Sequence, residues 1–277
     1  MAIITLTTDF GLKDPSTGAV KGAILSELEG VNIVDISHNV SPFHITEAAY
    51  IIKNAYSSFP KGTIHIIGVD SEITPENKHI AIQLDDHFFI CANNGIMSLI
   101  AAEIKPQKLV EVNIHNAIET NFPVLDVFVK VACHIARGGT LEVIGKSIPE
   151  VKQITKLNPF INDNQDQIIG HVMYIDTYGN VVTNISRKIF ENIGKGRSFT
   201  INARSTSFTT IHESYSHAID FNSPKDNREE EGKKLAIFNA SNYVEIAIYK
   251  SNPHTVGSAS TLLGLQLMDT INIKFNS

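Results

Sequence analysis

The sequence predicts an α/β domain followed by a smaller, all-β and barrel-like domain. Over residues 1–160, short apolar and β-branched segments alternate with helical patterns, which predicts a mostly parallel sheet with flanking helices. Over residues 161–277, short alternating strands follow one another and the helical pattern fades, which predicts the barrel-like sheet. The segment 158–167 begins with Asn-Pro and is rich in Asn, Asp and Gln, a composition typical of a linker.

The first predicted strand, Ile3–Thr8, is followed by two carboxylates, Asp9 and Asp14, and then by a helix predicted over 18–28. Ligands of open α/β sheets lie beyond the carboxyl ends of the strands, so both side chains are expected at such a crevice. A carboxylate there suits either the paired hydroxyls of a ribose or the positive charge of a cationic ligand. Asp14 beside Pro15 also suits a helix cap, and the two roles are compatible.

The rest of the first domain continues the alternation, with turn residues at the element boundaries. One strand ends in Asp70, and Asn93-Asn94 follows a predicted hairpin, so more polar side chains are expected at the edge that holds Asp9. The predicted strands span 31–36, 63–70, 80–84, 88–91 and 109–114, and the predicted helices span 45–56, 96–104 and 124–137.

The second domain carries a polar cluster of its own, between its first two predicted strands. The segment Asp176-Thr177-Tyr178-Gly179-Asn180 suits a hairpin turn, and its carboxylate and amide also suit a ligand site. The charged run 228–234 is predicted to be a solvated hairpin loop. The predicted strands span 168–176, 181–185, 198–201, 235–239, 244–248 and 270–275.

Composition and motifs exclude several classes of function. The chain has a net charge of −6 and no stripe of Lys and Arg, which argues against a nucleic-acid partner. It has no GxxxxGK[ST], no GxGxxG after a strand, no GxSxG and no metal-ligand spacing of His, so no phosphate-cradling or metal site is predicted. Cys91 and Cys133 lie in apolar stretches and are expected to be buried thiols. No signal peptide or membrane-length apolar run is found, so we expect a cytoplasmic protein without a membrane partner.

A set of sequence blocks extends over nearly the whole chain in a fixed order. In the first domain they are Thr7–Pro15, Gly18–Gly22, Asp35–His38, Phe59–His65 and Asn93–Gly95. In the second domain they are Ile175–Ile185, Val244–Ala247, Gly257–Ala259 and Leu263–Leu265. This ordered set resembles the S-adenosylmethionine (SAM) hydroxide adenosyltransferase family, which also contains the fluorinase and chlorinase enzymes.

The resemblance implies a homotrimer that binds SAM between the α/β domain of one subunit and the β domain of its neighbour, without a further cofactor. It implies that Asp9 holds the ribose hydroxyls, that Asp14 and Ser16 lie toward the methionine end, and that Asp176 meets the methionine amine. These roles suit the chemistry of the side chains. The residues to which it assigns adenine contacts are Tyr178, Asn180, Tyr215 and the backbone at Ser258 and Ala259.

The resemblance also implies a displacement at the ribose C5′ carbon by a water that an Asp, an Arg and a His position. Asp70 stands at the Asp position, but Asn77 stands at the Arg position and Pro123 at the His position. Proline cannot act as a base, and asparagine cannot supply the fixed charge of arginine. The residues of the altered loop that could compensate are Glu72, Glu76, Lys78 and His79.

The expected substrate pocket departs from the family in two further places. Ile73 and Val124 stand where the halogenases have pocket hydroxyls, and with Phe122 and Pro123 they predict an apolar lining. The family's Asn-Ser-x-Gly pattern is Asn-Ala-Ser-Asn here, which weakens the expected contact of Ser241 with the methionine carboxylate.

Three functions remain open at this point. The first is an enzyme that cleaves SAM to adenosine and L-methionine through Asp70 and a rearranged loop. The second is a protein that binds SAM or adenosine without turnover. The third is a related enzyme that acts on another 5′-substituted adenosine.

Overall fold

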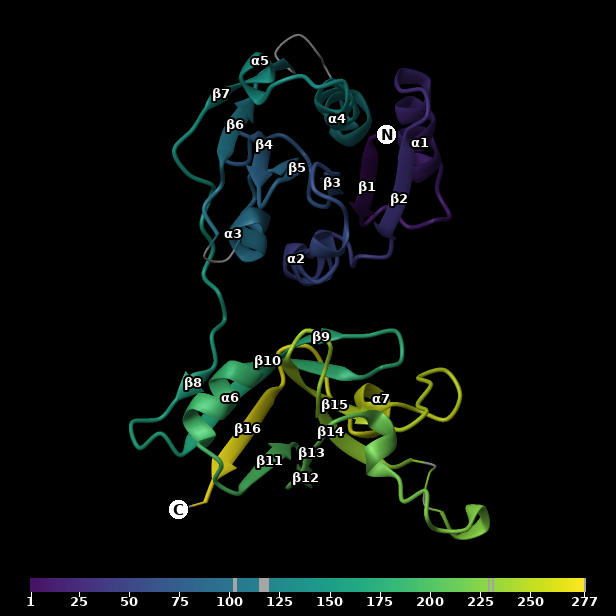
Figure 1. Ribbon diagram of the computed structural model, residues 1–277, viewed down its shortest axis with the longest axis vertical. Coiled ribbons are helices and arrows are strands. Elements are labelled where there is room, and N and C mark those ends of the chain that lie inside the picture. Colours follow the sequence, from purple (N-terminus) through teal and green to yellow (C-terminus); the bar gives the residue numbers. More distant parts are fainter. Residues whose placement is uncertain (102–103, 115–119, 229, 231, 277) are drawn as a thin grey trace. The chain divides into compact units, whose positions relative to one another are not determined.

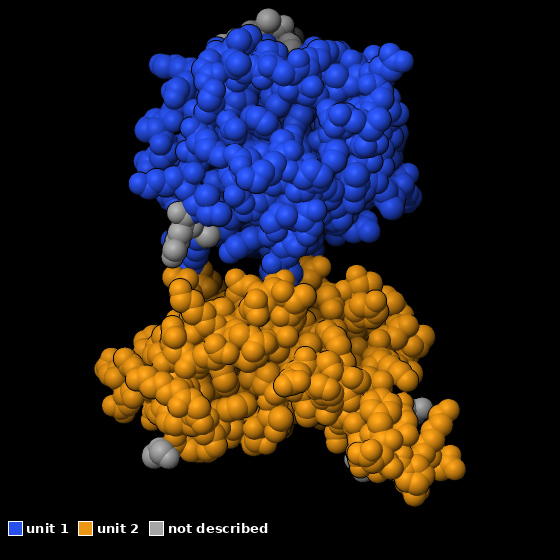
Figure 2. Space-filling view, in the orientation of Figure 1, with its two compact units in different colours: residues 1–156 blue, residues 157–277 orange. Residues whose placement is uncertain are grey.

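The computed structural model describes residues 1–101, 104–114, 120–228, 230 and 232–276 (Figure 1). The chain divides into two compact units, residues 1–156 and residues 157–277, which Figure 2 colours separately. Each unit has its own sheet and its own hydrophobic core. The division falls one residue before the segment with linker composition.

Among the described residues of the first unit, seven strands form a sheet in the order β2-β1-β3-β5-β4-β6-β7. β2, β1, β3 and β5 are parallel, whereas β4, β6 and β7 run antiparallel to their neighbours. The direction changes at Asp85-Asp86, whose φ angles of 50° and 61° suit a two-residue hairpin. The sheet is therefore mixed rather than mostly parallel, because the predicted hairpin reverses its second half. The strands span Ile3–Thr8 (β1), Asn32–Ser37 (β2), Ile64–Gly68 (β3), His79–Leu84 (β4), His87–Ala92 (β5), Lys108–Val112 (β6) and Gly145–Ser147 (β7).

Helices cover both faces of this sheet (Figure 1). One face packs against α1 and α4 through a core that includes Ile4, Leu6 and Phe128, and the other packs against α2 and α3 through a core that includes Phe89. The helix predicted over 124–137 begins as a π-turn, η3, and continues as α4. The helical segments are Ser16–Glu27 (α1), Ile45–Lys53 (α2), Tyr56–Ser58 (η1), Ile96–Ala101 (α3), Val124–Phe128 (η3), Val129–Ala136 (α4) and Leu141–Ile144 (α5).

The two cysteines are buried free thiols, as predicted. Burial raises the pKa of the Cys133 thiol to about 11, so this side chain packs as a neutral, weakly polar group. Among the described residues, every helix falls short of the length and apolar character that crossing a bilayer requires.

In the described part of the second unit, nine strands form a sheet in the order β12-β11-β16-β9-β10-β15-β14-β13, with β8 paired to β9. Only Thr209 and Thr210 separate β12 from β13 along the chain, although the two strands lie at opposite ends of this order. The sheet must therefore curl until its edges come close, as the barrel-like prediction requires. The strands span Phe160–Ile161 (β8), Gln167–Ile175 (β9), Val181–Ser186 (β10), Phe199–Ala203 (β11), Thr206–Phe208 (β12), Ile211–His212 (β13), Lys234–Phe238 (β14), Tyr243–Ile248 (β15) and Thr270–Phe275 (β16).

Short helical segments interrupt the strands of this unit. The sequence pattern did not predict α6, which Ser186 caps by accepting a hydrogen bond from the backbone N–H of Ile189 at 3.3 Å. Its apolar side chains pack on the barrel core, and phenylalanines of three other elements surround Phe190. The helical segments are Arg187–Gly194 (α6), Tyr215–Ala218 (η4), Lys225–Asn227 (η5) and Ala259–Leu262 (α7).

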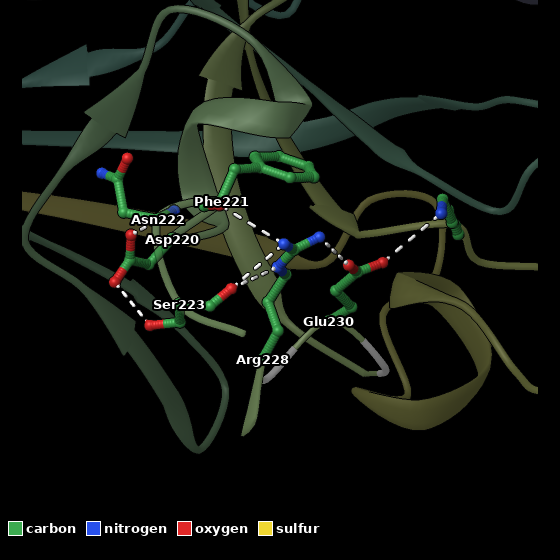
Figure 3. A network of polar contacts seen from close by, with 7 residues as sticks. Asp220, Phe221, Asn222, Ser223, Arg228 and Glu230 are labelled. Carbon is green, nitrogen blue, oxygen red and sulfur yellow. Dashed lines mark hydrogen bonds and ion pairs between the residues drawn. The ribbon is translucent and has the colours of Figure 1, made fainter. Parts of the chain in front are cut away.

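Two residues of the charged run 228–234, Arg228 and Glu230, are bound within the fold and not solvated (Figure 3). The Arg228 guanidinium lies 4.8 Å from the centre of the Phe221 ring, donates to the backbone carbonyls of Phe221 and Ser223, and pairs with Glu230 at 3.0 Å. The side chains of Arg228 and Glu230 are only 18% and 21% exposed, so the prediction is wrong for these two residues. Residues 229 and 231 lie outside the described residues.

Candidate functional site

The first polar cluster lies at one edge of the first sheet. β1 pairs in parallel with β3, and β3 pairs in parallel with β5, so the carboxyl ends of the three strands share an edge. Asp9, Asp70 and the pair Asn93-Asn94 follow these strands directly or within two residues. The structure thus brings together the acids and amides that the sequence places at this edge.

The turn that holds Asp9 is bound to the loop after β2. The Phe43 backbone N–H donates to Asp9 Oδ2 at 2.9 Å, and the Gly11 N–H donates to the His38 carbonyl at 2.8 Å. Phe43 has a φ of 61°, which is uncommon for a bulky side chain, and it is 74% exposed. A strained backbone that presents an exposed aromatic residue and binds a carboxylate through its N–H is a candidate part of a ligand site. Phe43 was not predicted as a site residue, because its only local signal is the Ser-Pro that precedes it.

A buried polar chain stands behind this turn. A hydrogen bond of 2.8 Å joins Thr8 Oγ1 and His38 Nδ1, and His38 Nε2 lies 3.0 Å from Asp35 Oδ1. Lys21 Nζ contacts the other oxygen of Asp35 at 2.6 Å. Thr8 and His38 are almost fully buried, so this chain fixes the end of β1 against the end of β2.

Asp14 and Ser16 lie beside the same turn, at the start of α1. Asp14 is exposed and Ser16 is half-buried. The helix begins after Pro15, which occupies the cap position without a side-chain hydrogen bond. The alternative role of Asp14 as a helix cap is therefore wrong. Thr17 holds the turn instead, since its hydroxyl donates to the Gly11 carbonyl at 3.0 Å.

Asp70 occupies a left-handed conformation at the end of β3, with a φ of 46°. The Asn94 side-chain amide donates to the carbonyls of Asp70 and Val69 at 3.1 and 3.3 Å and clamps this backbone. A second contact of 2.9 Å, between His79 Nε2 and the Ser71 carbonyl, closes the loop that follows. Aspartate tolerates positive φ better than most residues, and these contacts fix the position of Asp70 at the sheet edge.

Asn77 is bound by a lysine from a distant part of the chain. Lys152 Nζ donates to Asn77 Oδ1 at 2.9 Å, and the Lys152 backbone N–H donates to Asn93 Oδ1 at 2.8 Å. An ammonium group is thus bound to the residue that stands at the family's arginine position. His79, one of the suggested substitutes, is fully buried and bound to the Ser71 carbonyl, so it cannot face solvent as a base. Lys152 was not predicted as a site residue, because it lies 75 residues from Asn77 along the chain.

The predicted apolar lining lies next to this edge. The Phe122 ring packs edge-on against Phe10 at 5.4 Å, and Pro123 precedes η3. Gly68 at the end of β3 faces these groups, because a Cβ added there would lie 3.0 Å from Val124 and 3.2 Å from Phe10. Ile73 is half-buried in the loop that follows Asp70.

The second polar cluster starts with the turn Asp176–Asn180 in the second unit. The Asn180 backbone N–H donates to Asp176 Oδ1 at 2.8 Å, and its side-chain amide donates to Oδ2 at 3.0 Å. Gly179 has a φ of 73° and lies so close to Ser258 that no side chain would fit. Burial raises the pKa of the Asp176 carboxyl despite these hydrogen bonds. Tyr178, at the tip of the turn, is 66% exposed.

Tyr215 is linked to this cluster by Glu245, which was not predicted as a site residue. The Tyr215 hydroxyl donates to Glu245 Oε1 at 2.6 Å, and Glu245 is only 3% exposed. Burial raises the pKa of the Glu245 carboxyl, and the nearby charge of Asp176 raises it further. Burial and the bond to Glu245 also raise the pKa of Tyr215, with smaller contributions from Asp176 and Tyr178. These four side chains therefore share one electrostatic environment.

Ser258 and Ala259 lie beside the Asp176 turn, at the start of α7, where both are fully buried. The Ser258 side chain caps the helix and its N–H donates to Thr261 Oγ1 at 2.8 Å, so both groups are used within the fold. Ser241 lies elsewhere. It is in the turn between β14 and β15, at the Ser186 end of β10, whereas the Asp176 turn lies at the Val181 end.

The described residues contain no group of three or more His, Cys, Asp or Glu side chains placed to hold a metal ion.

Two family models match the chain. The SAM hydroxide adenosyltransferase N-terminal domain matches residues 4–145, and the C-terminal domain of the same family matches residues 170–272. The chain belongs to the SAM hydroxide adenosyltransferase family. The resemblance inferred from the ordered sequence blocks is thereby confirmed, and the two matched domains coincide with the two units.

Individual proteins and a solved structure are also similar to this chain. An (R)-S-adenosyl-L-methionine hydrolase from Methanocaldococcus jannaschii is 26% identical, with 98% of this chain and 95% of the relative covered. A fluorinase from Nocardia brasiliensis is also 26% identical, with 70% and 74% covered. The crystal structure of an uncharacterized conserved protein from Thermotoga maritima superposes with a TM-score of 0.80 at 25% identity, with 98% of this chain and 99% of that chain covered.

Proposed function

We propose that this protein binds SAM and cleaves it to adenosine and L-methionine by attack of water or hydroxide at C5′. The observation that carries the proposal is the sheet edge where Asp9, Asp70 and Asn94 meet in a chain of this family. The match to a named SAM hydrolase over 98% of the chain supports it.

The proposed reaction breaks the bond between C5′ and the sulfonium sulfur. The electron pair of that bond stays on sulfur and gives neutral methionine, while the water oxygen forms a new bond to C5′ and gives adenosine. The water proton passes to Asp70 or to solvent. No cofactor is needed, because the sulfonium is already an activated leaving group. The protein has to hold the water in line behind C5′ and exclude competing water.

The first unit supplies the ribose end of the proposed site. Asp9 accepts one hydrogen bond from Phe43, and a carboxylate retains further lone pairs for the two ribose hydroxyls. The exposed Phe43 ring offers a flat apolar surface next to them. Asp14 and Ser16, at the start of α1, would face the methionine end. Asp70 would position the water, with Phe122 and Ile73 lining its pocket.

Lys152 supplies the positive charge that the Asn77 position lacks. Its ammonium is held at Asn77, in the loop that begins at Asp70. There it would stabilise the Asp70 carboxylate and a hydroxide-like nucleophile. This role would explain how a chain without the expected arginine and histidine could still activate water.

The second unit supplies the adenine and amine ends. Asp176 would meet the methionine amine, and the exposed Tyr178, with Asn180, Tyr215 and the backbone at Ser258 and Ala259, would surround adenine. Because the Ser258 N–H is used within the fold, the remaining backbone groups there would make the contact. Ser241 would reach only the far end of the ligand, the methionine carboxylate.

We further propose that the protein works as a homotrimer in the cytoplasm, with SAM or adenosine between subunits and no nucleic-acid or membrane partner. The two polar clusters, one in each unit, support this proposal, because each would contact only one end of SAM. Sedimentation of the purified protein tests the trimer.

The direct test is incubation of the purified protein with SAM in ¹⁸O-labelled water, followed by chromatography and mass spectrometry against a control without enzyme. Labelled adenosine and methionine are expected. Intact SAM recovered from protein that binds it would favour the binding protein without turnover. Protein that does not bind SAM but binds another 5′-substituted adenosine would favour an enzyme that acts on that compound.

A further inference from the structure

Glu245 is a carboxylate on an interior strand of the second sheet. It lies on β15, opposite Val182 of β10 on one side and Ile237 of β14 on the other, and is 3% exposed. Strands on both sides fix its backbone. A carboxylate at such a position destabilises the fold unless hydrogen bonds compensate for the lost water. Its presence therefore calls for an explanation other than packing.

The partners of Glu245 do not neutralise its charge. Among the described residues, its hydrogen-bond and charge partners are Tyr215, Asn239 and Asp176, and none of these is a cation. Asp176 is itself a partly buried acid whose pKa burial raises. Two carboxylates thus share a low-dielectric environment, an arrangement more common at functional sites than in ordinary cores.

Tyr215 depends on Glu245 for its orientation. It lies on η4, a turn in which no side chain is buried, and is itself 39% exposed. The ring is therefore only partly covered by its surroundings. The hydrogen bond of 2.6 Å from its hydroxyl to Glu245 attaches it to an interior strand of the barrel. This bond uses the only proton of the hydroxyl, so the hydroxyl cannot also donate to a ligand, and the ring is the larger surface that can meet one.

We propose that Glu245 is a positioning residue of the ligand site, which holds the Tyr215 hydroxyl so that the tyrosine ring, not the hydroxyl, faces the nucleoside. The inference rests on the proposed function, since it assumes an adenosyl ligand at this cluster. Glu245 acts through Tyr215 and does not touch the reacting atoms.

The charge of Glu245 has a second effect on the ligand. Together with Asp176, it makes the cluster negative, which favours a cationic adenosyl compound over a neutral nucleoside. SAM carries a sulfonium and an ammonium, whereas adenosine carries no charge. Glu245 therefore increases the affinity ratio of SAM to adenosine and favours release of the neutral product.

Three variants separate these effects. Glu245→Leu removes both acceptor and charge, Glu245→Gln keeps an acceptor and removes the charge, and Tyr215→Phe removes the donor but keeps the ring. Calorimetry with SAM and with adenosine measures the affinity of each variant, and thermal unfolding measures its stability.

We expect Glu245→Leu to weaken binding of both ligands by about tenfold without lowering the unfolding midpoint, because a buried carboxylate is replaced by an apolar side chain. We expect Glu245→Gln to retain adenosine affinity and to reduce the ratio of SAM to adenosine affinity.

The double variant tests the link between the two residues. If the hydroxyl serves only to anchor the ring, Glu245→Leu combined with Tyr215→Phe binds adenosine no worse than either single variant. Additive losses would instead mean that the hydroxyl contacts the ligand directly and would overturn the proposal. Unchanged binding by Tyr215→Phe would overturn it as well, and does not depend on how Glu245→Leu folds.

Failure of this inference is distinguishable from failure of the proposed function. Wild-type protein that binds neither SAM nor adenosine would refute the proposed function. Wild-type protein that binds both, with Glu245→Leu and Tyr215→Phe binding equally well, would refute the role of Glu245 alone.

Discussion

The two polar clusters are built in different ways. At the edge of the first sheet, Asp9 is bound by a backbone N–H, and an amide clamps the Asp70 backbone, while both side chains stay partly accessible. In the second unit, Glu245 is almost fully buried and Asp176 is half-buried, and burial raises the pKa of both carboxyls. The first arrangement leaves lone pairs available to hydroxyl groups and water, whereas the second holds negative charge where a cationic ligand would stabilise it.

This difference predicts that the first cluster governs turnover and that the second governs recognition of the ligand's charge. Changes at the first edge should act on the reaction and on ribose binding, and changes at the second cluster should act on ligand charge and on stability. The following variants test this separation.

The largest effect is expected for Asp70→Asn. Asparagine tolerates the left-handed conformation but cannot accept a proton, so kcat for SAM cleavage should fall by about 10² to 10⁴ while the Kd for SAM stays unchanged. Rapid-quench turnover and calorimetry measure the two quantities. Asp86→Asn is the matched control, because Asp86 also has a positive φ, 61°, but lies in the β4–β5 hairpin. A parallel loss of SAM affinity in Asp70→Asn would contradict the separation.

Asp9→Ala should weaken binding of both adenosine and SAM by about 10- to 100-fold, because it removes the charged acceptor for the ribose hydroxyls. Asp14→Ala is the comparison, since this residue is assigned to the methionine end and should weaken SAM binding alone. Calorimetry with each ligand measures both variants. Unchanged adenosine affinity in Asp9→Ala would remove the ribose assignment.

Lys152→Met should reduce kcat by about tenfold, because it removes the charge-assisted hydrogen bond at Asn77. Its Kd for SAM should not change. Adding Asn77→Arg to this variant returns a cation to the same loop and should restore turnover. Lys146→Met, at another exposed lysine of the first unit, is the control. Full activity of Lys152→Met would show that this ammonium has no part in the reaction.

The smallest expected effect is on stability as a function of pH. Burial raises the pKa of the Glu245 carboxyl above its ordinary value of 4.5, so in the window above 4.5 the folded chain binds a proton that the unfolded chain releases. The contribution of this group to stability therefore falls as pH rises through that window. Glu245→Gln should raise the unfolding midpoint of the ligand-free protein by about 2–4 °C at pH 8. The gain should disappear near pH 4.5; a gain that does not vary with pH would contradict the assigned cause.

Local patterns were sufficient for most strands and for the position of the first cluster. The hairpin at Asp85-Asp86 and the carboxyl ends of β1, β3 and β5 follow from short apolar runs and turn residues. The pattern was insufficient for α6, a helix of 8 residues among strands, and for β12 and β13, which span 3 and 2 residues. Segments this short carry too few periods to be distinguished from loops.

The two-domain organisation, the family and the residues at the strand ends, including Asp9, Asp70 and Asp176, could be predicted from local sequence patterns and the ordered blocks. That Phe43, Lys152 and Glu245 stand beside predicted site residues depends on the tertiary fold. Their partners lie 34, 75 and 30 residues away along the chain. Periodicity reports how a segment is buried, but which distant segments meet depends on how loops close and cores pack, and no local pattern records that.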